Sequence, residues 1–184
     1  MYYYYQYIYY LQFTLFYGGL KMNKKLVEEI NVQINKEIFS GYLYLAMAAH
    51  FEQENLSGFA HWMKVQAGEE LEHAMKMFEF LNEVGERVVL DAIEKPDEKF
   101  GSPLKVAEQV LEHEQFVTSR IHLLYKLAIE ANEYPAQVFL QWFVTEQVEE
   151  EKNATEIVEM LKLGGESGNA LIMLDRALAQ RKAD

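Results

Sequence analysis

Apolar residues recur every three or four positions along four long stretches of this chain, the spacing that places side chains on one face of an α-helix. The stretches cover residues 23–54, 57–84, 102–132 and 135–164. A shorter amphipathic stretch with Leu171, Leu174 and Leu178 follows them. Three prolines, ten glycines and many Glu, Lys, Leu and Ala residues also favour helices over sheets. The pattern predicts an all-α fold of four long helices and one short one.

Polar residues interrupt each of the four long apolar stripes near its middle. They are Glu37 in the first stripe, Glu70 and His73 in the second, Glu114 in the third, and Gln147 and Glu150 in the fourth. Because every interruption lies at mid-length, packing the four stripes together brings all of these residues into one layer, whichever way each helix runs. This layer is a candidate metal site.

The predicted ends of the helices follow from local signals. Expected N-caps are Asn23, Ser57 and Ser102, with Pro103 and Pro135 as first-turn prolines and Gly85 and Gly164 as stops. The irregular segment 86–101 is long for a loop inside a compact domain. A four-helix bundle whose middle helices run parallel needs such a crossover. We therefore expect a four-helix bundle with one long crossover and a short fifth helix at the C-terminal end.

Composition limits the function classes. The chain has 184 residues, half of them hydrophobic, which suits one domain with a sizeable core. It contains no cysteine, which excludes disulfides, zinc fingers and thiolate clusters and is compatible with a cytoplasmic location. The net charge of −12 repels nucleic acids and membrane surfaces and attracts cations. We expect no nucleic-acid or membrane partner.

Charge balance favours metal in the polar layer. Glutamate is rarely buried without a partner, and two carboxylates about 4 Å apart repel each other by roughly 4 kcal/mol at an effective dielectric of about 20. No lysine or arginine lies on the four stripes at this level, so we expect no salt bridge to compensate. Four glutamates balance two divalent cations, with Glu70 best placed to bridge them. Taken alone, Glu70 and His73 would more readily be interpreted as a buried hydrogen-bonded pair, and the coincidence of four interrupted stripes favours metal instead.

The ligand types narrow the choice of metal. Carboxylates with one imidazole suit iron, manganese or zinc rather than copper(I). A symmetric dinuclear carboxylate site uses two Glu-x-x-His pairs, but the fourth stripe offers Gln147 and Glu150 in the second place. The second ion should be held more weakly, which suits a site that passes iron on.

Other polar residues near the layer have two interpretations. Glu69, Glu146 and Glu149 are either solvated or form a third, more exposed cation site, and Glu150 could face either side. Tyr44 is either a core tyrosine or a redox partner of the metals. The remaining histidines are interpreted as structural or surface residues: His50, His61, His113 and His122.

Residues 1–21 form a separate region, with eight of the twelve tyrosines and no acidic residue. The segment lacks the features of a signal peptide and fits a membrane span poorly. Residues 18–22 can be back-translated as a ribosome-binding site followed by a start codon. We hypothesise that translation begins at Met22, which intact-mass measurement of the natively expressed protein would test.

Four segments resemble, in their order and spacing, the ferroxidase motifs of the ferritin family, specifically those of the non-haem bacterial and archaeal ferritins. They are NKEIFSGYLY (35–44), EELEH (69–73), HEQ (113–115) and FLQWFVTEQVEEE (139–151). The similarity covers residues 22–184. The chain lacks the second Glu-x-x-His of bacterioferritins and rubrerythrins, and no haem is expected.

The resemblance implies a shell of twenty-four subunits that oxidises Fe²⁺ with O₂ or H₂O₂ and stores ferric mineral. The residues that resemble first-iron ligands are Glu37, Glu70 and His73. Those that resemble the environment of the second iron are Glu70, Glu114, Gln147 and Glu150. Glu69, Glu146 and Glu149 fall where many relatives bind a third iron, Tyr44 matches a tyrosine beside the centre, and the fifth helix matches the one that lines the four-fold channel.

Three functions are compatible with the polar layer. The leading hypothesis is an iron-storage ferroxidase. A second is a di-iron oxidase or peroxidase that keeps its metals as a cofactor, and a third is a non-catalytic bundle with structural glutamates. Iron uptake per assembly separates the first two.

Overall fold

The computed structural model describes residues 21–165 and 167–182, and within this part of the chain it contains helices and no strands. The helices are α2 (Lys24–Gln53), α3 (Ser57–Glu83), α4 (Pro103–Glu130), α5 (Tyr134–Gly164) and α6 (Gly168–Leu178). The predicted number and order of helices are confirmed. The proposed N-terminal extension lies, apart from Lys21, outside the described residues. No helix in the described ranges is long and apolar enough to cross a membrane.

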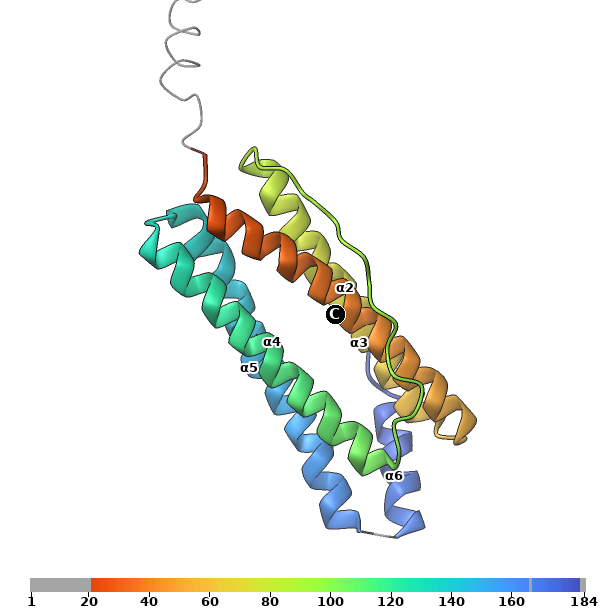
Figure 1. The fold of residues 1–184 in the computed structure, drawn as a ribbon. Coiled ribbons are helices and arrows are strands. Elements are labelled where there is room, and N and C mark those ends of the chain that lie inside the picture. The colour runs from red at the N-terminus through yellow and green to blue at the C-terminus, as the bar shows by residue number, and fades with distance from the viewer. Residues whose placement is uncertain (1–20, 166, 183–184) are drawn as a thin grey trace, which may run out of the picture.

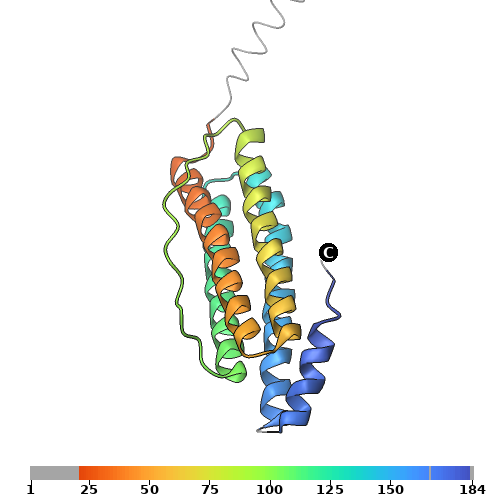
Figure 2. The same cartoon turned by 90° about the vertical axis from the view of Figure 1, so that its right-hand side faces the viewer.

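Helices α2 to α5 form a four-helix bundle, shown in Figure 1. Helix α2 packs mainly against α3, and α4 mainly against α5, so the bundle consists of two helical hairpins. Helices α3 and α4 run in the same direction, and the segment between them extends along α2 over the length of the bundle (Figures 1 and 2). This is the long crossover that the sequence predicts.

The crossover is held to α2 by side chains of that helix. The Asn31 side chain donates to the Arg87 carbonyl and accepts from the Val89 N–H, and the Asn35 amide donates to the Ala92 carbonyl. These bonds satisfy backbone groups that belong to no regular element. The crossover is therefore a fixed strap rather than a free loop.

The helix ends mostly follow the predicted signals, with one correction. Asn23 and Ser102 each accept a hydrogen bond from the first turn of their helix, as expected of N-caps. Ser57 does not cap α3. Instead the Asp175 carboxylate of α6 accepts from the backbone N–H groups of Gly58 and Phe59. The cap comes from a distant segment, which ties α6 to the start of α3.

The core consists of two hydrophobic clusters, one toward each end of the bundle. One cluster includes Phe51, Phe59 and Val106, and the other includes Ile30, Met77 and Leu140. Within the described residues, the nine buried polar residues come from the middle parts of α2 to α5, at or near the points where the apolar stripes are interrupted. The predicted polar layer is thus present between two apolar halves of the bundle.

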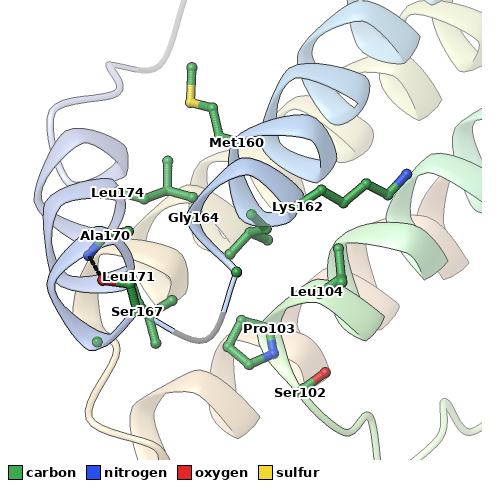
Figure 3. Close-up of a pocket in the computed structure, with 13 residues that line it drawn as sticks. Ser102, Pro103, Leu104, Met160, Lys162, Gly164, Ser167, Ala170, Leu171 and Leu174 are labelled. Carbon is green, nitrogen blue, oxygen red and sulfur yellow. Dashed lines mark hydrogen bonds between the residues drawn. The ribbon is translucent and has the colours of Figure 1, made fainter.

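Helix α6 packs against α3 and α5 at the end of the bundle where α4 begins (Figure 2). A groove of about 590 Å³ lies between α6, the end of α5 and the start of α4. Figure 3 shows Pro103, Leu104, Leu171 and Leu174 among its lining residues. The lining includes none of the polar residues of the middle layer, so this groove is separate from the candidate metal site.

We predict that Gly58→Ala destabilises the docking of α6. A Cβ atom at Gly58 would lie 1.7 Å from the Asp175 backbone oxygen, a contact that no rotamer change can relieve. We expect a loss of about 2 kcal/mol or more in stability, as for other overpacked sites, seen as a lower midpoint in thermal unfolding. Gly68→Ala in the same helix is the control, because its Cβ would meet nothing within 4 Å. The control should stabilise the protein by roughly 1 kcal/mol, and equal midpoints for both variants would contradict the prediction.

Candidate metal centre

The six residues that interrupt the apolar stripes are all buried. Their exposed fractions lie between 1% and 4% for Glu37, Glu70, His73, Glu114, Gln147 and Glu150. They come from all four long helices, as the stripe pattern predicts. Carboxylates buried this deeply require a compensating charge or protonation.

One half of the centre is formed by α2 and α3. Ligand atoms of Glu37, Glu70 and His73 lie within 4.8 Å of one another. Glu70 and His73 are separated by one helical turn, and His73 Nδ1 lies 3.6 Å from Glu70 Oε2. Gly41 of α2 allows the two helices to lie close together, because a Cβ at that position would lie 3.0 Å from the carbonyl oxygen of Ala67 in α3. Two carboxylates and an imidazole are a suitable ligand set for iron, manganese or zinc.

The other half is formed by α4 and α5. The Gln147 amide nitrogen lies 3.2 Å from the Glu114 carbonyl oxygen and 3.4 Å from Glu114 Oε2. Since the NH₂ group faces Glu114, the amide oxygen of Gln147 is available as a ligand. The Tyr44 hydroxyl donates a hydrogen bond to Glu114 Oε1. Tyr44 is therefore in direct contact with a candidate ligand.

Glu150 lies on the inner side of α5, which settles the question of which way it faces. It is 4% exposed, and its Oε2 accepts a hydrogen bond of 2.8 Å from Gln66. Together with His73 and Glu146 it forms a second group whose ligand atoms lie within 4.8 Å of one another. His73 thus belongs to both groups.

Burial controls the protonation of the centre. Burial, followed by repulsion from Glu70, raises the pKa of Glu37 from 4.5 to about 8. The pKa values of Glu114 and Glu150 rise to about 7, chiefly by burial, and burial also raises the pKa of Glu70 well above 4.5. Burial and the Glu114 carboxylate raise the pKa of Tyr44 well above 10. Without metal the centre therefore holds protons at neutral pH, and a cation would replace them.

Two carboxylate oxygens show that the centre fits a cation. Glu37 Oε2 and Glu70 Oε2 are buried and have no amide, hydroxyl, lysine or arginine partner, so that the two carboxyl groups have only each other as hydrogen-bond partners there. Buried acceptors without a partner are costly, by about 1–3 kcal/mol each. A metal ion between Glu37, Glu70 and His73 would satisfy both oxygens at once.

The three residues of the predicted third cation site have different surroundings. Glu146 lies at the centre, with Oε1 4.0 Å from His73 Nε2. Glu69 forms an ion pair with Arg181, and Glu149 is exposed. Within the described residues, the two groups that could hold a metal include Glu146 but neither Glu69 nor Glu149.

Arg181 brings a positive charge near the layer from outside the four stripes, although among the described ion pairs no lysine or arginine is joined to Glu37, Glu70, Glu114 or Glu150. Arg181, which follows α6, reaches Glu69 and Gln66 on α3. Its charge lowers the pKa of Glu150, although burial outweighs this effect. The helical periodicity gave no signal for this contact, because Arg181 lies outside the four stripes.

Two glutamines next to the ligands were also missed. Gln33 and Gln66 are fully buried, and each precedes a ligand glutamate by four residues. Gln33 Nε2 donates to Glu37 Oε1 at 3.0 Å, and Gln66 Nε2 lies 3.4 Å from Glu70 Oε1. The spacing of four was the available signal, since it places neighbours on one helix face.

The other histidines have structural contacts, as interpreted from the sequence. His50 bonds to the Gly101 carbonyl and His61 to the Arg181 carbonyl, while His122 is exposed. His113 lies 2.8 Å from the Ser40 hydroxyl, and burial and Lys36 lower its pKa to about 4.

Comparison with known proteins identifies the family. The model of the ferritin-like domain family matches residues 27–164. The chain belongs to the ferritin family. A bacterial non-heme ferritin of Bacteroides fragilis is 41% identical over 160 residues, which are 87% of this chain and 99% of the relative. One from Campylobacter jejuni is 38% identical over 166 residues, 88% of this chain and 99% of the relative.

Solved ferritin structures agree with this assignment. An open pore ferritin from the archaeon Archaeoglobus fulgidus is 51% identical, with a TM-score of 0.86 over 87% of this chain and 98% of that chain. An engineered closed form of the same ferritin has a TM-score of 0.87 and 50% identity over 89% of this chain and all of that chain. The expected ferritin-like four-helix bundle of an iron-storage ferritin is confirmed.

Proposed function

We propose that this ferritin oxidises Fe²⁺ at the centre formed by Glu37, Glu70, His73, Glu114, Gln147 and Glu150 and stores the product as ferric mineral. The observation that carries the proposal is the pair of buried oxygens, Glu37 Oε2 and Glu70 Oε2, that lie beside His73 and have no amide, hydroxyl, lysine or arginine partner. An acidic, water-poor cluster of this kind favours a cation that displaces the bound protons.

The arrangement suits two iron ions taken as substrate. Glu37 and His73 serve the first, Glu114, Gln147 and Glu150 serve the second, and Glu70 lies between the two sets. Two Fe²⁺ ions lose two electrons together, which is the number that reduces O₂ to the level of H₂O₂ when two protons are added. Tyr44 is placed beside Glu114, where its hydroxyl holds that carboxylate in position. The described residues of the centre contain one histidine, so the second iron should leave more readily.

We further propose that chains assemble into a shell of twenty-four, as the family resemblance implies. Single chains leave several large apolar side chains exposed, among them Leu163 at 87% and Met173 at 73% near α6. Exposed apolar side chains that gather on one face are typical of interfaces. The groove in Figure 3 lies at the same corner and would be covered by further copies. A cytoplasmic location and a third iron at Glu69, Glu146 and Glu149 remain part of the proposal.

Two measurements on the same preparation test this function. Twenty-four chains of 21.5 kDa would elute near about half a megadalton, and we expect aerobic Fe²⁺ addition to load hundreds of iron ions per assembly. Saturation near roughly two ions per chain would indicate a di-iron enzyme with retained metals instead. A monomer or dimer without iron uptake would contradict storage.

A further inference from the structure

Two arginines from different segments approach the metal centre, each through a buried glutamine. The Nε atom of Arg120 in α4 lies 3.2 Å from Gln33 Oε1, and the Nη1 atom of Arg181 lies 2.7 Å from Gln66 Oε1. Neither arginine is a candidate ligand, because a guanidinium carries donors only. Both contacts bring a charge-assisted hydrogen bond to a residue that touches the ligands.

Each arginine is held in place by a glutamate of the helix that carries the glutamine. Arg120 Nη2 lies 2.7 Å from Glu29 Oε2, and Arg181 pairs with Glu69. All four side chains of these ion pairs are mostly buried, with exposed fractions of 15% to 28%. Arg181 also stacks 4.6 Å from the centroid of the Trp62 ring.

The arginines determine which way the glutamine amides point. Because a guanidinium only donates, it must face the amide oxygen, and the NH₂ group of each glutamine must face the carboxylates. Gln33 then bonds Glu37 Oε1, and Gln66 bonds Glu150 Oε2 at 2.8 Å and contacts Glu70 Oε1 at 3.4 Å. The oxygens that these amides leave without a partner are Glu37 Oε2 and Glu70 Oε2, which border the candidate iron site.

We propose that Arg120 and Arg181 are positioning residues of the metal centre. They act through Gln33 and Gln66, which bond one oxygen each of Glu37, Glu70 and Glu150 and leave Glu37 Oε2 and Glu70 Oε2 for iron. The inference rests on the proposed function of this site. Arg181 belongs to the C-terminal segment, whose docking at Gly58 and Phe59 by Asp175 thereby becomes part of the site's construction.

A double-mutant cycle tests the route through glutamine. The variants are Arg181→Gln, Gln66→Leu and the double variant, with Co²⁺ as a redox-inert probe titrated without oxygen and followed by its visible absorption. Arg181→Gln should weaken Co²⁺ binding about 10-fold or more, the effect usual for partners of metal ligands. It should add little in the Gln66→Leu background, because residues that act through one another are not additive. The apparent KM for Fe²⁺ should rise more than kcat falls.

The controls separate positioning from folding and from the proposed function. Arg176→Gln removes an equivalent charge from an exposed residue of α6 and should leave Co²⁺ affinity unchanged. Arg120→Gln with Gln33→Leu repeats the cycle on the other side, should a variant of Arg181 fail to fold. Additive effects in both cycles, or unchanged Co²⁺ affinity in both arginine variants of a protein whose wild type binds Co²⁺, would overturn the positioning role alone. A wild type that binds no Co²⁺ and oxidises no Fe²⁺ would overturn the proposed function as well.

Discussion

Glu70→Ala will reduce aerobic Fe²⁺ oxidation by about 100-fold or more, because Glu70 is the carboxylate placed between both halves of the centre. The change removes Glu70 Oε2, one of the two oxygens that face the candidate iron site, and deprives His73 of its carboxylate neighbour. Oxidation is followed by the absorbance of ferric product after a fixed Fe²⁺ addition. Glu72→Ala is the matched control, since Glu72 lies on the same helix but is mostly exposed and pairs only with Lys76 among the described ion pairs. Wild-type rates in the Glu70 variant would refute the site.

A second substitution at Glu70 distinguishes a metal centre from a cluster of glutamates that serves stability only. Glu70→Gln keeps the shape of the side chain but cannot hold iron as a carboxylate does. In the metal-free protein at pH 8.5, where repulsion among the carboxylates is largest, we expect this variant to be more stable than wild type. If the glutamates served stability only, the substitution would lower the midpoint of thermal unfolding at every pH.

Metal-free protein will lose stability as pH rises through about 7 to 8. The folded-state pKa values of Glu37, Glu114 and Glu150 stand above the ordinary value of 4.5. Between pH 4.5 and these values the folded state binds more protons than the unfolded state. The stability that these groups contribute is therefore fully present below about pH 4.5 and is lost as pH rises through the folded-state pKa values. Thermal unfolding at pH 6.0 and 8.5 should show a lower midpoint at the higher pH. Added Co²⁺ should remove most of the difference.

The number of protons released on metal binding also tests whether the buried glutamates are protonated in the metal-free protein. At pH 6 the buried glutamates are protonated, so metal binding should release roughly three or more protons per chain, and clearly fewer at pH 8.5. An indicator dye in weak buffer measures this release during anaerobic Co²⁺ addition. The absence of proton release at both pH values would show that the carboxylates are ionised before metal binds.

Helical periodicity was sufficient to place the buried polar layer that contains the candidate ligands. A spacing of three and four residues reports which face of a helix is buried, and residues at mid-length must meet whichever way the helices run. For this reason Glu37, Glu70, Glu114 and Glu150 could be brought together without any knowledge of direction. The crossover followed from the length of 86–101 alone.

Contacts between distant segments were beyond this reasoning. Arg181 lies 112 positions from Glu69 in the chain, and nothing in its own segment indicates that partner. The Asp175 cap of α3 likewise depends on how α6 docks, whereas Ser57 offered a local signal that the fold does not use. Glu69 looked equivalent to Glu146 and Glu149 in sequence, and only the fold shows that an arginine pairs with it.

The most direct test of a two-iron substrate site is anomalous X-ray diffraction from crystals soaked with Fe²⁺ without oxygen. We expect two iron peaks inside each bundle, one beside Glu37 and His73 and one beside Glu114 and Glu150, with Glu70 in contact with both. The peak beside Glu150 should have the lower occupancy at limiting iron. Iron found only on the surface of the chain, with the space between these glutamates free of anomalous signal, would contradict the account.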